Sequence, residues 1–433
     1  MSLLLRYESA GAWGASSGLT QSDLARLGPT LDKLRDELCD VDERLLAGEL
    51  AIPLSKQPLG SAFYALPATM LSQYAAGRSA SPLGQMLVVT KQLMSEVDQI
   101  VVLGDRRALA GPKALMAACC QPYYNQLSRA ARGSRPRVHF LGDRLDNDAV
   151  QGVMHLLGAH RQRAARGVAE RWALVVVGQQ MVTPAHTRLL PALLESLAVN
   201  AADDSQTLQR DVRAERTIWV TGDDSPLLQT ARQIGSTHVI SVPAQIGLGY
   251  TGLSMIGLVP AALLGINVMQ LLEGAQAVSQ HFSQTKSVEN LVLQMAGTQH
   301  LLDQQWPLGP QRWMGWNRAL GATGQWYRSL IGGSLQRELT VSSTAGSGSF
   351  EAGRPGWSMQ VFSAGYRFDP LATVVDAQEE DLVQAFRGFR SAGWPTVSLS
   401  VPHIDEPSVG QLLQALMLST VIAARLQGRN PYT

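Results

Sequence analysis

The stretch Gln99-Ile-Val-Val-Leu103, which continues directly into Gly104-Asp-Arg-Arg-Ala-Leu-Ala-Gly111, indicates the fold of the chain. An aliphatic run that stops at a glycine and continues into a helical pattern is typical of a strand–turn–helix unit. Near-continuous apolar strands belong to parallel sheets that are covered on both faces. We therefore predict a buried strand over 99–103 and a helix that begins just after Gly104.

The same pattern recurs along the chain. Four further runs precede helical stretches: Arg137-Val-His-Phe-Leu141, Trp172-Ala-Leu-Val-Val-Val177, Thr217-Ile-Trp-Val-Thr221 and His238-Val-Ile-Ser-Val242. Five strands that alternate with helices predict a doubly wound α/β domain. We place this domain at residues 86–243.

The flanking regions have different patterns. Residues 1–85 predict an N-terminal helical segment, because leucines recur at helical spacing from Leu24 onward. Residues 244–433 predict a second, less regular α/β domain. Its expected elements are an apolar helix over 253–270, a helix over 289–302, strands over 358–362 and 396–401, and a helix over 408–427. A glycine- and serine-rich stretch, 342–356, predicts a mobile loop.

The composition excludes several classes of function. The 433 residues include 36 basic and 35 acidic side chains, and the charged fraction of 16% is low. Such a balance argues against a nucleic-acid-binding surface. The chain has no uninterrupted run of ~18 apolar residues, so no membrane span is predicted. Three cysteines make neither a disulfide framework nor a zinc site. We expect a cytoplasmic protein without a metal, a cofactor, nucleic acid or membrane as partner.

Ligands of open parallel sheets bind beyond the carboxyl ends of the strands. Three segments that follow predicted strands therefore carry the candidate site. The first is Gly104–Gly111, the second is Gly178-Gln-Gln-Met-Val-Thr183, and the third is Gly247-Leu-Gly-Tyr-Thr-Gly-Leu-Ser254 with Gly257-Leu258. The start of a helix, as after Gly104, is a ready site for an anion.

These segments resemble the motifs of the glucose-6-phosphate isomerase family, which is built from two sugar-isomerase (SIS) domains. The family writes the first motif as Gly-Ile-Gly-Gly-Ser-x-Leu-Gly, and this chain keeps its outer glycines as Gly104 and Gly111. The family writes the second motif as Ser-Lys-Ser/Thr-x-Thr/Asn-Thr, and this chain keeps its last residue as Thr183. The third fits Gly-Gly-Arg-Tyr/Phe-Ser-x-x-Ser-x-x-Gly-Leu at Gly247, Tyr250, Thr251, Ser254, Gly257 and Leu258. Gly428-Arg-Asn-Pro-Tyr432 is similar to the segment before the last family signature.

The resemblance covers about residues 90–433 and carries several expectations. It implies two doubly wound SIS-like α/β domains behind the N-terminal helical segment. It implies interconversion of glucose 6-phosphate and fructose 6-phosphate, a reaction of glycolysis and gluconeogenesis. A phosphosugar ligand and a homodimer are implied as well.

The family's catalytic residue types are missing at the matching positions. Gly333 stands where the resemblance places the carboxylate base, and Gly249 stands where it places an arginine. The family histidine falls near Gly356-Trp357-Ser358, and the catalytic lysine would follow Thr433. We therefore predict no catalytic residue and little or no isomerase activity, since a loss of several transition-state partners removes most of the rate.

Six residues remain as phosphosugar-binding candidates: Gly104, Arg106, Arg107, Gln179, Thr183 and Thr251. Each has an alternative role. Arg106 and Arg107 either bind an anion or close the turn with bulky side chains. Thr183 either binds phosphate or caps a helix, and Thr251 with its neighbours either binds or packs a helix start. Gln179 stands where the family has a phosphate-loop lysine.

Three other features each have two possible interpretations. Glu338 is either a replacement base or a solvated charge, and His186 either approaches the cleft or packs. The tryptophans between 306 and 326 are either core residues or a stacking surface for a sugar. For the chain as a whole, two functions stay open. One is an isomerase with a rebuilt site, and the other is a non-catalytic protein that binds a phosphosugar or a protein partner.

Overall fold

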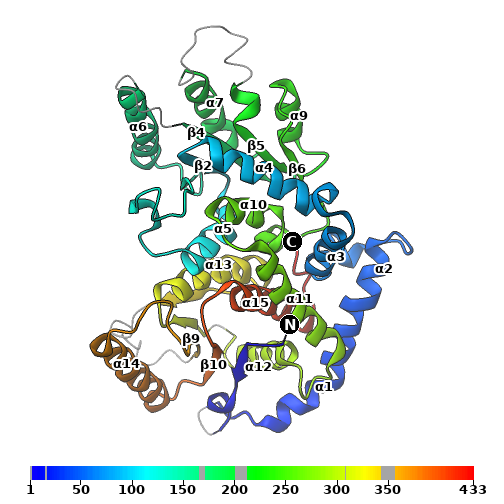
Figure 1. The fold of residues 1–433 in the computed structure, drawn as a ribbon. Helices are drawn as coiled ribbons and strands as arrows, with labels where there is room; N and C mark the ends of the chain where they lie inside the picture. The colour runs from blue at the N-terminus through cyan, green and yellow to red at the C-terminus, as the bar shows by residue number, and fades with distance from the viewer. Residues whose placement is uncertain (1, 15–16, 165–170, 200–211, 308, 343–355) are drawn as a thin grey trace. The chain divides into compact units, whose positions relative to one another are not determined.

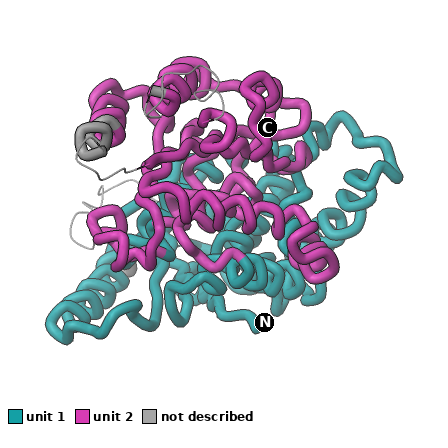
Figure 2. Tube along the Cα trace, turned by 45° about the horizontal axis from the view of Figure 1, so that its top comes forward, with its two compact units in different colours: residues 1–67, 117–119, 269–433 teal, residues 68–116, 120–268 magenta. Residues whose placement is uncertain are grey.

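The structure is a computed structural model that describes all residues except 1, 15–16, 165–170, 200–211, 308 and 343–355. Contacts divide the chain into two compact units (Figure 2). Unit 1 comprises residues 1–67, 117–119 and 269–433, and unit 2 comprises residues 68–116 and 120–268. Most of the predicted loop at 342–356 lies outside the described residues.

The two units divide the chain at other positions than the predicted domain boundaries, 85/86 and 243/244. Both of those boundaries fall inside unit 2. The reason is that α4 (Pro82–Glu96) packs on α10 (Met255–Leu264), and α10 packs on the strands of the unit 2 sheet. A helix that begins before residue 86 and a helix that follows residue 243 therefore pack in the same unit as the predicted domain.

The sheet of unit 2 has five parallel strands in the order β3-β2-β4-β5-β6 (Figure 1). They are β2 (Gln99–Leu103), β3 (Arg137–Leu141), β4 (Trp172–Gly178), β5 (Thr217–Thr221) and β6 (Val239–Ser241). These are the five predicted strands. β2, β4 and β5 are buried along their whole length, as an interior parallel strand requires.

Helices cover both faces of this sheet. Leucines of α6, α7 and α9 pack with Leu103, Leu174 and Trp219 on one face, and α10 lies against the strands on the other. The bounds are α3 (Leu66–Gly77), α4, α5 (Arg106–Cys119), α6 (Asn147–Ala164), α7 (Pro184–Val199), α9 (Pro226–Gln233), the short η6 (Leu248–Leu253) and α10. The predicted doubly wound architecture is confirmed for this unit.

The sheet of unit 1 has the order β1-β10-β9-β7-β8, and all its pairs are parallel except the edge pair of β1 with β10. Its strands are β1 (Arg6–Glu8), β7 (Gln311–Gly315), β8 (Leu339–Ser342), β9 (Trp357–Ser363) and β10 (Thr396–Val401). β9 and β10 match the prediction. β1, β7 and β8 were not predicted, because they have three to five residues and mix polar with apolar side chains.

The helices of unit 1 lie on both faces of its sheet. Trp313 of β7 contacts Tyr327 of α13, and its neighbour Met314 packs with Phe389 of α14. The bounds are α1 (Gln21–Asp36), η2 (Glu37–Val41), α2 (Asp42–Leu46), α11 (Val268–Gln284), α12 (Leu291–Gln305), α13 (Arg318–Ser334), α14 (Ala372–Ser391) and α15 (Glu406–Leu426). Trp313 and Trp326 are buried in this core.

α15 packs against α1, α12 and α13. Within the described residues it is the one helix whose length and hydropathy would allow a membrane crossing. However, 89% of its most apolar window is buried inside the structure. That degree of burial is what a core helix shows.

The apolar helix predicted over 253–270 is wrong in one respect, because the structure has two helices there, α10 and α11. Gly265 ends α10 with a positive φ of 76°, a left-handed conformation that favours glycine. A Cβ atom at Gly265 would also lie 1.9 Å from Nε of Arg135. The chain therefore turns at this glycine before α11 begins.

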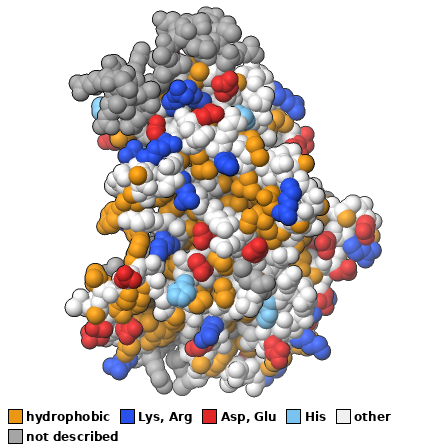
Figure 3. All heavy atoms as spheres, viewed as in Figure 1, with side chains coloured by type: hydrophobic (Ala, Val, Ile, Leu, Met, Phe, Trp, Pro, Cys, Tyr) orange, Lys and Arg blue, Asp and Glu red, His pale blue; other side chains and the backbone are white. Residues whose placement is uncertain are grey.

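Charged side chains of both signs are interspersed on the face that Figure 3 shows. Lysines and arginines form no broad continuous patch among the described residues drawn there.

Candidate functional site

All six candidate residues lie at the carboxyl edge of the unit 2 sheet. Gly104, Arg106 and Arg107 follow β2, Gln179 and Thr183 follow the neighbouring strand β4, and Thr251 lies in η6 beyond β6. This is the edge at which ligands of open parallel sheets bind. The chemistry of the edge therefore depends on which of its polar groups are available.

Gly104 is enclosed by neighbouring strands. Its N–H donates to the carbonyl oxygen of Leu141 over 3.1 Å, and a Cβ atom here would lie 2.6 Å from Cγ2 of Val177. Gly142, after β3, reaches equally close, because its Cβ would lie 2.5 Å from the carbonyl oxygen of Gly104. These glycines permit close packing of backbone on backbone.

Asp105 occupies the N-terminus of α5. Its carboxylate oxygen Oδ1 accepts hydrogen bonds from the backbone N–H groups of Arg107 at 2.7 Å and Ala108 at 3.0 Å. The first N–H groups of a helix are the donors that bind a phosphate at such a position. Here an internal anion already binds them, while the side chains of Arg106 and Arg107 are exposed.

Gln179 uses its side chain to hold a neighbouring loop. Its Nε2 donates to the carbonyl oxygens of Pro243 at 2.8 Å and Ile246 at 2.7 Å. Its backbone oxygen accepts from the N–H of Gly222 at 2.7 Å, and the residue is only 5% exposed. The amide that stands in place of a lysine is thus a structural link between the end of β4 and the segment after β6.

Thr183, which is half-buried, and the buried His186 form a pair at the start of α7. Nε2 of His186 faces the carbonyl oxygen of Val177 at 3.0 Å, so this nitrogen carries the proton. Nδ1 then accepts from the hydroxyl of Thr183 at 2.9 Å and from its backbone N–H at 3.2 Å. Burial lowers the pKa of His186 and keeps the ring neutral. The hydroxyl of Thr183 therefore serves the helix start.

Thr251 is buried, and its hydroxyl donates to the carbonyl oxygen of Leu248 at 3.3 Å. Its own carbonyl oxygen accepts from the hydroxyl of Ser254, the residue that caps α10. Gly111 of α5 packs on the same turn, since a Cβ there would lie 2.9 Å from Cα of Gly252. The third motif segment thus positions a helix start against α5.

Neither Gly249 nor Gly333 has a side chain that could transfer a proton or stabilise charge. Gly249 is half-buried in η6, and Gly333 lies in the last turn of α13 in unit 1. A Cβ atom at Gly333 would contact no atom of the described residues within 4 Å. Glu338, the possible replacement base, is exposed. Among the described residues, no group of three His, Cys, Asp or Glu side chains could hold a metal ion.

Asp105 and the inward hydrogen bonds of His186 are the features that the sequence analysis missed. An aspartate directly before a helical pattern is a capping signal. That signal could have identified Asp105 as an anion placed on the predicted phosphate turn.

Known structures and proteins of similar sequence identify the fold. A crystal structure of glucose-6-phosphate isomerase from Chlamydia trachomatis superposes with a TM-score of 0.73 at 16% identity, over 99% of this chain and 85% of that one. The chain has the fold of a glucose-6-phosphate isomerase. A hypothetical protein of Thermus thermophilus gives a TM-score of 0.71 at 19% identity, over 99% and 96% of the two chains.

Sequence similarity is low but extends over most of the chain. Glucose-6-phosphate isomerase of Rubrobacter xylanophilus is 23% identical over 393 residues, which are 82% of this chain and 84% of that protein. No protein-family model matches the chain. The similarity to glucose-6-phosphate isomerases thus combines a shared fold with a strongly diverged sequence.

Proposed function

We propose that this chain is a glucose-6-phosphate isomerase-like protein that interconverts glucose 6-phosphate and fructose 6-phosphate slowly or not at all. The observation that carries the proposal is the carboxylate of Asp105 on the N–H groups of Arg107 and Ala108. An incoming phosphate would have to displace this anion and would be repelled by it. The inward bonds of Gln179 and Thr183 leave fewer donors at the same edge.

The chemistry of the reaction supports the same conclusion. Isomerisation through an enediol needs a base that moves a proton between C1 and C2 of the sugar. It also needs cations that stabilise the developing negative charge. Gly333 and Gly249 stand where the resemblance places a glutamate base and an arginine.

The function that remains is binding without catalysis, in a regulatory or scaffold protein. Exposed Arg106 and Arg107 favour a phosphosugar as ligand, since arginine binds phosphate well. A protein partner is favoured by exposed apolar side chains in the same unit, namely Met181 at 68% and Leu248 at 42%. A cytoplasmic homodimer, as the resemblance implies, belongs to this proposal.

A coupled assay tests the catalytic part. Purified protein is given fructose 6-phosphate, and glucose 6-phosphate is detected through an NADP-dependent dehydrogenase, with a known isomerase as positive control. We expect a rate at the level of the protein-free blank. A turnover number on the order of 10 s⁻¹, typical of enzymes, would contradict the proposal.

Thermal unfolding with phosphosugars tests the binding part. A ligand at 100 times its Kd stabilises the folded state by about 2.7 kcal/mol. A shift that is lost in the double variant Arg106→Ala/Arg107→Ala supports a phosphosugar ligand at this edge. No shift with any phosphosugar leaves a protein partner as the ligand.

A further inference from the structure

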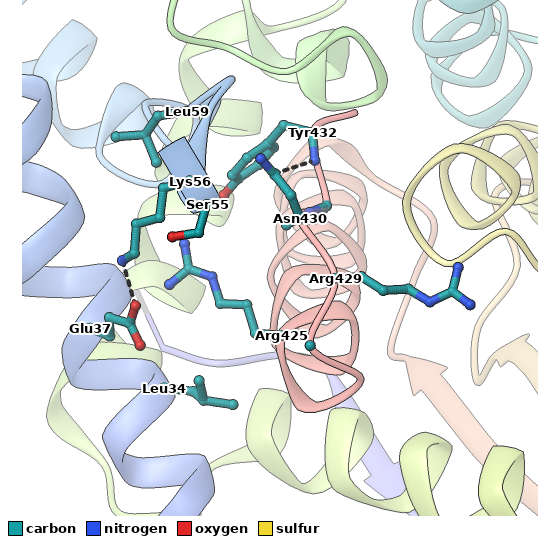
Figure 4. Close-up of a pocket in the computed structure, with 11 residues that line it drawn as sticks. Leu34, Glu37, Ser55, Lys56, Leu59, Arg425, Arg429, Asn430 and Tyr432 are labelled. Atoms are coloured by element: carbon teal, nitrogen blue, oxygen red, sulfur yellow. Dashed lines mark hydrogen bonds and ion pairs between the residues drawn. The ribbon is translucent and has the colours of Figure 1, made fainter. Parts of the chain in front are cut away.

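A cavity lies within unit 1, apart from the residues that the proposed function uses. It has a volume of about 220 Å³ and opens between η2, the segment 55–59 and the end of α15 (Figure 4). Three cationic side chains line it, Lys56, Arg425 and Arg429, against the single carboxylate of Glu37. Leu34 and Leu59 contribute apolar wall.

A buried group of charges supports the cationic wall from behind. The side chain of Asp42 is 1% exposed, and it accepts from Nζ of Lys56 at 2.7 Å and from Nη2 of Arg425. Lys56 also pairs with Glu37. Both carboxylates of the group are therefore already bound to cations.

The cations keep donors that this pairing does not use. The side chain of Arg425 is 10% exposed, and within the described part of the chain its Nη1 makes no hydrogen bond of good geometry, although the hydroxyl of Tyr432, another wall residue, interacts with the guanidinium. A guanidinium has five N–H donors and an ammonium has three. In Figure 4 the Arg425 guanidinium and the Ser55 hydroxyl are turned toward each other, and the Lys56 amine points to Glu37. The cavity thus offers more donors than acceptors.

Arg429 adds a third positive charge at the edge of the cavity. Its guanidinium points away from Lys56 and Arg425 (Figure 4) and donates to Oε1 of Gln336 at 2.7 Å. Counted together with Asp42, the five ionised groups carry three positive and two negative charges. The excess is positive.

We propose that this cavity binds a small oxyanion, either a carboxylate or a phosphate group, through Nη1 of Arg425 and the amine of Lys56. An acceptor-rich group is well suited to a buried guanidinium nitrogen whose partner carboxylate is already bound to a second cation. The volume fits a molecule of a few heavy atoms. This binding site depends neither on the sheet edge of unit 2 nor on isomerase activity.

Substitutions at Ser55 test the proposal. Ser55 is exposed in the segment beside the cavity, so Ser55→Glu places a carboxylate at the mouth without removing a member of the charge group. Ser55→Gln is the matched neutral control. Thermal unfolding is measured with inorganic phosphate and with succinate, each against sodium chloride at equal ionic strength.

We expect phosphate, succinate or both to raise the Tm of the wild type and of Ser55→Gln, and we expect the rise to be lost in Ser55→Glu. The anion that gives the rise identifies the chemistry of the ligand. Two results would overturn the proposal: no rise with either anion in the wild type, or an equal rise in Ser55→Glu, which would place the binding elsewhere.

A second variant examines the role of Arg425 itself. Arg425→Lys keeps a positive charge opposite Asp42 but removes the forked donor. Calorimetric titration with the active anion should give a Kd at least about tenfold weaker, since a lost charge-assisted hydrogen bond has that effect. An unchanged Kd in a folded Arg425→Lys protein would contradict the assignment. If this variant does not fold, the Ser55 pair still decides the question.

Discussion

The carboxylate of Asp105 does at the start of α5 what a bound phosphate does in proteins that hold one at a helix N-terminus. It places negative charge on first-turn N–H groups, at 2.7 Å and 3.0 Å. Only the source of the anion differs, because this one is covalently part of the chain. The turn can therefore keep its shape, including the enclosed Gly104, without a ligand.

Removing this carboxylate should open the turn to phosphate. In Asp105→Gly the N–H groups of Arg107 and Ala108 lose their acceptor, and glycine at a cap costs only a few tenths of a kcal/mol. We expect inorganic phosphate to bind at least about tenfold more tightly than to the wild type, measured by calorimetric titration. Glu338→Gln removes an exposed carboxylate that caps no helix and should give no gain. Equal affinities in wild type and Asp105→Gly would contradict this account of the turn.

His186 should make stability depend on pH in a defined direction. Burial lowers its pKa in the folded state, so the unfolded chain binds a proton first as the pH falls. Its contribution is complete above the ordinary histidine pKa of about 6.5 and is lost as the pH falls below it. The unfolding free energy of wild type minus that of His186→Gln should therefore shrink between pH 7 and pH 5 in urea titrations. A difference that grows toward pH 5 would contradict the neutral, inward-bonded ring.

At the scale of elements, the sequence predicted the strands in which apolar side chains recur at least at every second position. The predicted runs 99–103, 137–141, 217–221 and 396–401 coincide with β2, β3, β5 and β10. Short strands such as β7 were not predicted, because the polar residues Gln311 and Arg312 interrupt the apolar pattern before Trp313 and Met314. The break after α10 was not predicted because apolar residues continue on both sides of Gly265, although a glycine at such a position is a signal for the end of a helix.

The candidate site was predicted in position but not in its bonding. The three motif segments do lie at one sheet edge, as parallel topology requires. The partners of Gln179, however, are more than 60 residues away in sequence. No local sequence pattern shows that a side-chain amide will donate its hydrogen bonds to carbonyl groups distant in sequence. A ligand-binding role and a structural role therefore look alike in the sequence.

The link between Gln179 and the segment after β6 should be measurable. Gln179→Ala removes the donor to the carbonyl oxygens of Pro243 and Ile246 and leaves them without this partner. Hydrogen exchange of backbone amides over residues 244–254 should become faster, since local opening costs less free energy. The adjacent Gln180 is exposed, and Gln180→Ala should leave exchange unchanged. Equal protection in both variants would show that Gln179 does not hold this segment.

A buried carboxylate near the end of α12 should give the opposite pH dependence from His186. Asp303 accepts from Nε1 of Trp357 at 2.9 Å and pairs with Arg337 at 3.3 Å. Burial raises the pKa of Asp303 to about 6, although Arg337 opposes the shift. Its contribution is complete below the ordinary aspartate pKa of about 3.9 and is lost as the pH rises through 6.

The matched variant for this carboxylate is Asp303→Asn. The unfolding free energy of wild type minus that of the variant should fall between pH 4 and pH 6.5, by a total on the order of 3 kcal/mol. Urea titrations at several pH values measure it. A difference that is constant over this range would mean that Asp303 stays ionised in the folded protein.

At the scale of the whole molecule, the fold is shared with glucose-6-phosphate isomerases although the sequence has diverged strongly. A TM-score of 0.73 at 16% identity shows how fully the architecture is kept. Burial of apolar strands and helices preserves a fold through extensive substitution, whereas a site depends on a few ionisable groups. Glycine or glutamine stands at three positions where the resemblance places charge, namely Gln179, Gly249 and Gly333.

Restoring one of these charges should not restore the reaction. Gly333→Glu fits the structure, because a Cβ there meets no described atom within 4 Å, and replacing a helical glycine gains up to ~1 kcal/mol. We expect an unchanged or higher Tm and a coupled-assay rate still at background, since each missing electrostatic partner costs roughly 10²–10³ in rate. A large gain in rate from this single change would show that the remaining site is intact.

Solvent exchange is the most direct test of the central claim that no base in this chain moves the sugar proton. Fructose 6-phosphate is incubated with the protein in D₂O, and proton NMR follows deuterium at C1 of fructose 6-phosphate and at C2 of any glucose 6-phosphate that forms. An enediol mechanism incorporates solvent deuterium to the extent that the protonated base exchanges with solvent before it returns the proton, even when little product forms, so the coupled assay is run beside this measurement. The account predicts incorporation no faster than in the protein-free blank. Incorporation at a rate on the order of 1 s⁻¹ per protein or more would contradict it.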